Sequence, residues 1–174
     1  RQSRQRVALQ GPLRAWPQYV EHYFLLRRRV APSSAKDAAA ATLHIGAPIG
    51  WAEAAQLPLC LLTPEMHNRA IVDRAFAEAG ATVTPAIETN SVLTLALSVQ
   101  SGTVCAVLLG AMVDTVRGHG ALEALPLVAP EVRTAIGFMA PAAVKPSRAL
   151  EAALGMLQEE TWGAEVAGHS GALQ

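Results

Sequence analysis

Three short segments at predicted strand ends are the places best suited to contact a small molecule. They read Thr63-Pro64-Glu65-Met66-His67-Asn68, Thr89-Asn90-Ser91 and Leu109-Gly110-Ala111. Hydroxyl and amide side chains in the first two segments can make hydrogen bonds to a ligand. Both also precede predicted helices, whose unpaired backbone N–H groups favour an anion such as a carboxylate. Alternatively, these side chains only cap their own helices, and the two uses are compatible because a capping hydroxyl keeps a lone pair.

Residues for catalysis or metal binding are not grouped in the same way. The histidines are scattered and form no pair at helical spacing and no Cys/His cluster: His22, His44, His67, His119 and His169. Only His67 lies at a predicted strand end, and as a general base it would need a carboxylate partner, for which Glu65 and Glu88 are candidates. The sequence has no glycine-rich phosphate loop after the first strand and no GxSxG motif. We therefore predict no enzyme activity, no cofactor and no metal.

The elements that must position the three segments alternate between strand and helix. Leu59 to Leu62 is a short apolar run typical of a buried strand, and a helix is expected from a Thr63 cap, with Pro64 at its first position, to about Ala79. A strand over 83–88, a helix after Ser91 and a strand over 104–109 follow. Right-handed crossovers make such an order a parallel α/β sheet, whose strands end at a common edge.

The flanking segments are less regular. Residues 16–30 are expected to form two strands that end at Arg27-Arg28-Arg29, read as a solvated strand end rather than an anion site. We expect a loop or weak helix over 31–42, a helical turn at Trp51 and a strand over 134–140. A last helix opens at Pro146-Ser147-Arg148 with an apolar side, and the tail 163–174 is expected to fray.

Composition limits the class of protein. The chain has 174 residues, of which 51% are hydrophobic, enough for one ordinary domain or two small lobes. Its 14 basic and 14 acidic side chains show no basic excess, which argues against direct nucleic-acid binding. Cys60 and Cys105 lie in apolar runs and read as buried thiols of a reducing compartment. Since no signal peptide or membrane-spanning run is recognisable, we expect a cytoplasmic protein.

The ordered set of segments resembles the sensing domain of LysR-type transcriptional regulators over roughly residues 12–160. The stretch 57–69, Leu-Pro-Leu-Cys-Leu-Leu-Thr-Pro-Glu-Met-His-Asn-Arg, is similar to the family's entry into its second lobe. Ile87-Glu88-Thr89-Asn90-Ser91-Val92, the strand 104–109 and Leu125-Pro126-Leu127 match later parts, as do 134–139 and the final helix. Residues 16–29 resemble the family's strand pair near the end of the N-terminal part of the first lobe.

The resemblance implies an α/β, periplasmic-binding-protein-like (type II) fold with mostly parallel sheets. A small effector, often a carboxylate, binds between two lobes, and the domains form dimers or tetramers. The implied division is a polar segment 1–12, a first lobe over 13–50 and 131–162, a second lobe over 51–130, and a tail 163–174. With the strand ends found above, it indicates these ligand-binding residues: Thr63, Pro64, Met66, His67, Thr89, Asn90, Ser91, Leu109 and Gly110.

Departures from the family pattern refine these expectations. The family's DNA-binding head and the first strands of its first lobe should precede Trp16, so we expect an incomplete first lobe and contact with DNA only through a head outside this chain. Leu109-Gly110 and Val104 stand where the family commonly has proline and glycine. Two alternatives remain: a solute-binding protein of the same fold, and a small α/β enzyme, which would need a convergent acid–base pair.

Overall fold

A single mixed sheet organises the protein. The computed structural model describes residues 13–29, 42–116, 118, 121–142 and 147–168. Hydrogen-bonded neighbours in the sheet follow the order β2-β7-β1-β6-β4-β5, with β3 beside β7 and β8 beside β1. The strands are β1 (Leu13–Arg28), β2 (His44–Ile45), β3 (Ile49–Gly50), β4 (Leu59–Leu62), β5 (Ile87–Thr89), β6 (Cys105–Leu109), β7 (Leu122–Val128) and β8 (Arg133–Pro141).

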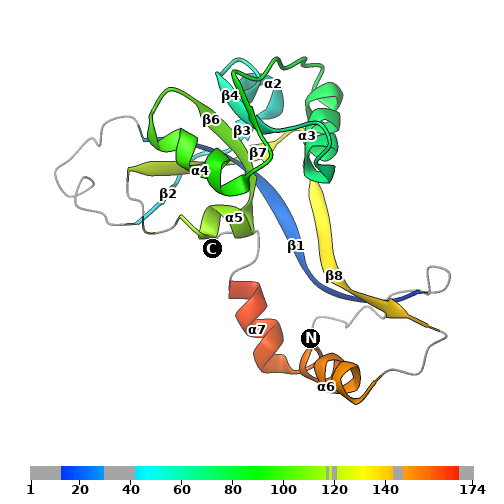
Figure 1. Cartoon of the computed structure of the whole chain (residues 1–174). Coiled ribbons are helices and arrows are strands. Elements are labelled where there is room, and N and C mark those ends of the chain that lie inside the picture. The colour runs from blue at the N-terminus through cyan, green and yellow to red at the C-terminus, as the bar shows by residue number, and fades with distance from the viewer. Residues whose placement is uncertain (1–12, 30–41, 117, 119–120, 143–146, 169–174) are drawn as a thin grey trace.

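Strand β1 belongs to two parts of the molecule. Its inner residues 23–28 run antiparallel to β6 and β7, while its outer residues 13–22 pair with β8. We call the two-stranded extension formed by 13–22 and 133–141 the ribbon, which leaves the sheet in Figure 1. The expectation of two strands over 16–30 is wrong: one strand runs through, with a register shift between Pro17 and Tyr19. Proline has no N–H for the ladder, which fits an irregularity there.

The segment 59–109 has the predicted strand–helix alternation, but β5 begins only at Ile87 and ends at Thr89, so it is shorter than the strand expected over 83–88. Strands β4 and β5 are parallel, as are β4 and β6, so the predicted parallel arrangement is confirmed. The connecting helices are α3 (His67–Glu78) and α4 (Val92–Gln100). Residues 23–28 pair with β6 and β7 of this same sheet. The division into two lobes stays a prediction.

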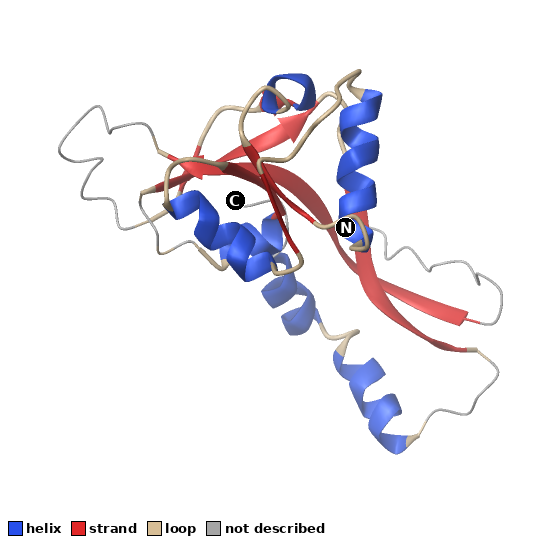
Figure 2. Ribbon diagram, turned by 45° about the horizontal axis from the view of Figure 1, so that its top comes forward, coloured by secondary structure: helices blue, strands red, loops and turns tan. Residues whose placement is uncertain are grey.

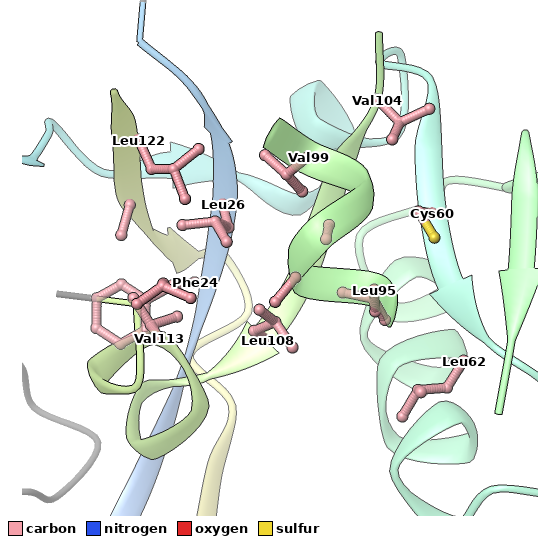
Figure 3. Close-up of a cluster of buried hydrophobic side chains, with 14 residues drawn as sticks. Phe24, Leu26, Cys60, Leu62, Leu95, Val99, Val104, Leu108, Val113 and Leu122 are labelled. Carbon is pink, nitrogen blue, oxygen red and sulfur yellow. The ribbon is translucent and has the colours of Figure 1, made fainter. Parts of the chain in front are cut away.

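Helices cover both faces of the sheet and bury two apolar clusters. On one face, α4 and α5 (Gly110–Asp114) cover a cluster that includes Phe24, Leu26 and Leu108, as Figure 3 shows. On the other face, α2 (Trp51–Ala54) and α3 cover a cluster centred on Trp51, which packs edge-on against Phe76. The predicted turn at Trp51 is therefore a buried element of the core. Consecutive residues of β4 alternate between the two clusters, as the period of a strand requires.

Two helices lie beside the ribbon, away from the sheet (Figures 1 and 2). Helix α6 (Arg148–Met156) starts at Ser147, whose Oγ accepts a hydrogen bond from the Leu150 amide, as predicted. Its expected apolar side covers nothing, because no residue of α6 is buried. Helix α7 (Glu160–Gly168) replaces the first half of the tail expected to fray, and Trp162 Nε1 donates to Gln18 Oε1 of β1 at 2.8 Å. The segment 1–12 and most of 31–42 lie outside the described residues.

Candidate functional site at the ends of three parallel strands

The three segments meet at one edge of the sheet, which we call the mouth (residues 63–68, 89–91 and 109–111). The Thr63 amide donates to the Thr89 carbonyl at 3.0 Å, joining the ends of β4 and β5. On the other side of β4, Leu59 is paired with Cys105 at the start of β6. Since all three strands run in the same direction, the end of β6 at Leu109 lies at this edge too.

At the first strand end the helix begins later than expected. The Met66 amide donates to the Thr63 carbonyl in a turn, Met66 itself is extended, and α3 starts only at His67. Thr63 is therefore not a helix cap and Pro64 is not the first helical residue, because the turn separates both from α3. The Thr63 Oγ1 atom is buried and finds no hydrogen-bond partner within the described part of the chain.

At the second strand end the capping prediction is confirmed. Ser91 Oγ accepts from the Thr94 amide at 3.2 Å, and Thr89 Oγ1 accepts from the Ser91 amide at 3.1 Å. Ser91 and Thr89 are half-buried, whereas Asn90 between them is exposed. The β5 end thus presents the Asn90 side chain to solvent beside a helix start.

Beneath the first two strand ends lies a buried arginine that sequence reasoning missed. Arg69 is 8% exposed and donates from Nη1 to the Leu62 carbonyl and to Glu88 Oε1, and from Nε to Asp73 Oδ1 at 2.7 Å. Burial alone would lower the pKa of Arg69, but its hydrogen bonds and ion pairs with Glu88 and Asp73 together raise it. The helical spacing of Arg69 and Asp73 was the available signal.

At the third strand end lies a buried carboxyl group, that of Glu21. Glu21, on the outer part of β1, is 1% exposed, and its Oε2 accepts a hydrogen bond from the Ala111 amide at 3.2 Å. Burial raises the pKa of Glu21, against hydrogen bonds from Ala111, Tyr19 and Gly110 and the charge of His22. Sequence reasoning missed Glu21 because it reads as an ordinary polar residue in a strand.

A second contact joins the ribbon to the mouth. Tyr23, two residues beyond Glu21 and on the same face of β1, donates from its hydroxyl to Asn68 Oδ1 at 2.7 Å. The same hydroxyl lies 3.5 Å from Thr134 Oγ1 of β8. The Tyr23 hydroxyl therefore links Thr134 of the ribbon to Asn68 near the start of α3.

Comparison with known proteins identifies the family. The family model described as the LysR substrate binding domain matches residues 7–162. The chain belongs to this family. A comparison with curated protein sequences found no match to this chain.

Solved LysR-type regulatory domains share the fold at low sequence identity. The reduced OxyR regulatory domain from Pseudomonas aeruginosa is 21% identical, with a TM-score of 0.60, covering 87% of this chain and 68% of that one. The CcmR regulatory domain of Synechocystis in complex with 2-PG is 15% identical, with a TM-score of 0.66, and the match covers 87% of this chain and 68% of that one. The QuiR effector-binding domain in complex with shikimate is 12% identical, with a TM-score of 0.62, and the match covers 91% of this chain and 69% of that one. The fold is thus the predicted α/β, periplasmic-binding-protein-like type.

The chain covers only part of whole regulators. It spans 46% of the full-length OxyR of Pseudomonas aeruginosa. Structures described as LysR family transcriptional regulators are among its structural neighbours, so the family is one of regulators. Among the helices of the described segments, none is long and apolar enough to span a membrane.

The suggested acid–base partners of His67 do not converge on it as the alternative of a small α/β enzyme would require. Glu88, one suggested partner of His67, is paired with Arg69 at 2.6 Å instead. His67 is exposed at the start of α3. The described residues contain no cluster of three or more potential metal-ligating side chains. Arg27, in the predicted solvated strand end, pairs with Glu123 at 2.9 Å.

Proposed function

We propose that this chain is the effector-sensing part of a LysR-type transcriptional regulator and binds a small metabolite at the mouth. One observation carries the proposal: three parallel strands end at one edge, at the root of the ribbon, and two of these ends carry hydroxyl and amide side chains. In open α/β sheets, ligands bind outside the carboxyl ends of the strands. The ligand-binding residues are Thr63, Pro64, Met66, His67, Thr89, Asn90, Ser91, Leu109 and Gly110.

The effector we propose is a carboxylate or a similar anion. Asn90 is exposed beside the start of α4, where amide N–H groups favour negative charge. The QuiR domain, which shares this fold, binds shikimate. We further propose a cytoplasmic protein without catalytic activity, which acts on DNA through a head domain outside this chain.

Sensing requires that the effector distinguish two arrangements of the domain. A ligand shifts a conformational equilibrium only by its difference in affinity for the two states. Tyr23 and Glu21 join the mouth to the ribbon, so a ligand at the mouth contacts segments that also hold the ribbon. The effector would therefore change the angle between the sheet and the ribbon.

A thermal-shift screen tests the proposal. A panel of small carboxylates that includes shikimate is expected to contain a compound that raises Tm, because a ligand that binds only the folded state stabilises it. Asn90→Ala should abolish that shift, whereas Gln100→Ala at the far end of α4 should keep it. A screen without any shift, or a shift that survives Asn90→Ala, contradicts the proposed site. A shift caused only by neutral compounds contradicts the proposed anion.

A further inference from the structure

The carboxyl group of Glu21 fills the end of β6. It accepts the Ala111 amide at 3.2 Å, directly after Gly110, where β6 passes into α5. With only 1% of the residue exposed, Glu21 is buried at this position. The Ala111 N–H, which an external anion would need at this strand end, already has an acceptor.

A second anion beside Glu21 would be unfavourable for two reasons. It would have to displace a side chain that is packed in place, and a like charge at close range in a buried site disfavours ionisation of either group. The end of β5 differs, because Ser91 and Thr89 use only one hydroxyl lone pair each and Asn90 is exposed.

We propose that Glu21 is a specificity-determining residue. Its own carboxyl group occupies the place at the end of β6 where an anionic group of the effector would otherwise bind. This inference rests on the proposed function and narrows it: the negatively charged group of the effector binds at the ends of β4 and β5. The part of the effector nearest β6 is then uncharged or carries a hydrogen-bond donor.

Chemical rescue tests the position of Glu21. In Glu21→Ala the carboxyl group is gone and the Ala111 amide is free, so formate should bind there and raise Tm saturably by a few degrees. The same concentration of chloride should not. Formate should leave the Tm of Glu21→Gln unchanged, because the amide oxygen still accepts from Ala111. Formate stabilising Glu21→Ala no more than Glu21→Gln would overturn the inference.

A measurement on the native protein keeps the inference testable if Glu21→Ala fails to fold. In nuclear magnetic resonance spectra, the Ala111 and Gly110 amide signals should stay in place during a formate titration. They should move when pH titrates Glu21, whose titratable neighbours are Tyr19, His22 and Tyr23. Saturable movement of these two amide signals with formate would show an external anion at the end of β6 and contradict the inference.

The two proposals fail in different ways. If a carboxylate raises the native Tm but moves the Ala111 signal, the sensing function stands and the role of Glu21 is wrong. If formate rescues Glu21→Ala while no compound raises the native Tm, Glu21 is placed correctly and effector sensing is wrong.

Discussion

Arg69 shows how much of the mouth depends on one side chain. Its guanidinium group joins the last residue of β4, the edge strand β5 and its own helix α3 through Leu62, Glu88 and Asp73. The two carboxylates are partly exposed, so they can recover water if the arginine is lost, whereas the Leu62 carbonyl is buried. The stabilisation therefore comes mainly from the buried end of the contact.

Replacing Arg69 with methionine tests this account. We expect Arg69→Met to lower the free energy of unfolding by about 1–3 kcal/mol, because a buried acceptor loses its donor. Arg74→Met, at an exposed position of the same helix, should change it by less than about 0.5 kcal/mol. Urea denaturation measures both variants, and equal effects would contradict a special role for Arg69.

The buried carboxyl group of Glu21 should make the stability of the folded protein depend on pH. Burial raises its pKa, so the folded protein holds this proton more tightly than the unfolded chain does. The resulting stability is complete below the ordinary pKa of about 4.3 and is lost as pH rises through the raised value. Glu21→Gln cannot ionise, so we expect its stability relative to the native protein to increase over that rise. Urea denaturation at several pH values measures the difference; one that stays constant with pH would contradict the prediction.

At the scale of elements, the two helix starts at the mouth differ. Ser91 caps α4 through its hydroxyl, whereas Thr63 is separated from α3 by a turn and its Oγ1 is buried without a partner among the described residues. A cap and an unsatisfied hydroxyl have opposite effects on stability.

Two substitutions separate these cases. Ser91→Ala should lower the free energy of unfolding by about 1 kcal/mol, since the Thr94 amide loses its acceptor. Thr63→Val keeps the shape and removes the buried hydroxyl, so it should be neutral or stabilising. Guanidinium denaturation measures both. Equal losses would mean that Thr63 also caps a helix.

The alternation of strands and helices between Leu59 and Leu109 could be predicted because each element carries its own local signal. Apolar runs and the cap at Ser91 both act over a few residues. Contacts between distant segments left no such signal: Glu21 meets Ala111, and Tyr23 meets Asn68, only after β1 inserts between β6 and β7. The polar strand ends were found, while the buried groups behind them were not.

On the scale of the whole molecule, one exposed surface is suited to self-association. Strand β5 is the edge of the sheet, and Ile87 on it is 41% exposed. On the neighbouring α4, Leu93 and Leu97 are 68% and 48% exposed. Exposed apolar side chains and an open strand edge are features that interaction sites share. We propose a second copy of the chain as the partner, because a symmetric dimer buries the same surface on both subunits.

Sedimentation velocity tests this dimer. The native chain is expected to sediment as a dimer, and Leu93→Glu should shift it towards monomer because a buried charge without a partner is costly. Met156→Glu, on the exposed helix α6, is the matched control and should leave the dimer intact. A native chain that is monomeric throughout, or a dimer that tolerates Leu93→Glu, would contradict the proposed surface.

Strand β1 has a mechanical consequence for any motion of this domain. Because the same strand is bonded to β6 and β7 at one end and to β8 at the other, the ribbon is not attached through a loose linker. The ladder is interrupted between Pro17 and Tyr19, beyond the anchors at Glu21 and Tyr23. We therefore expect any bending within the ribbon to concentrate at that interruption, while residues 19–22 move together with the sheet.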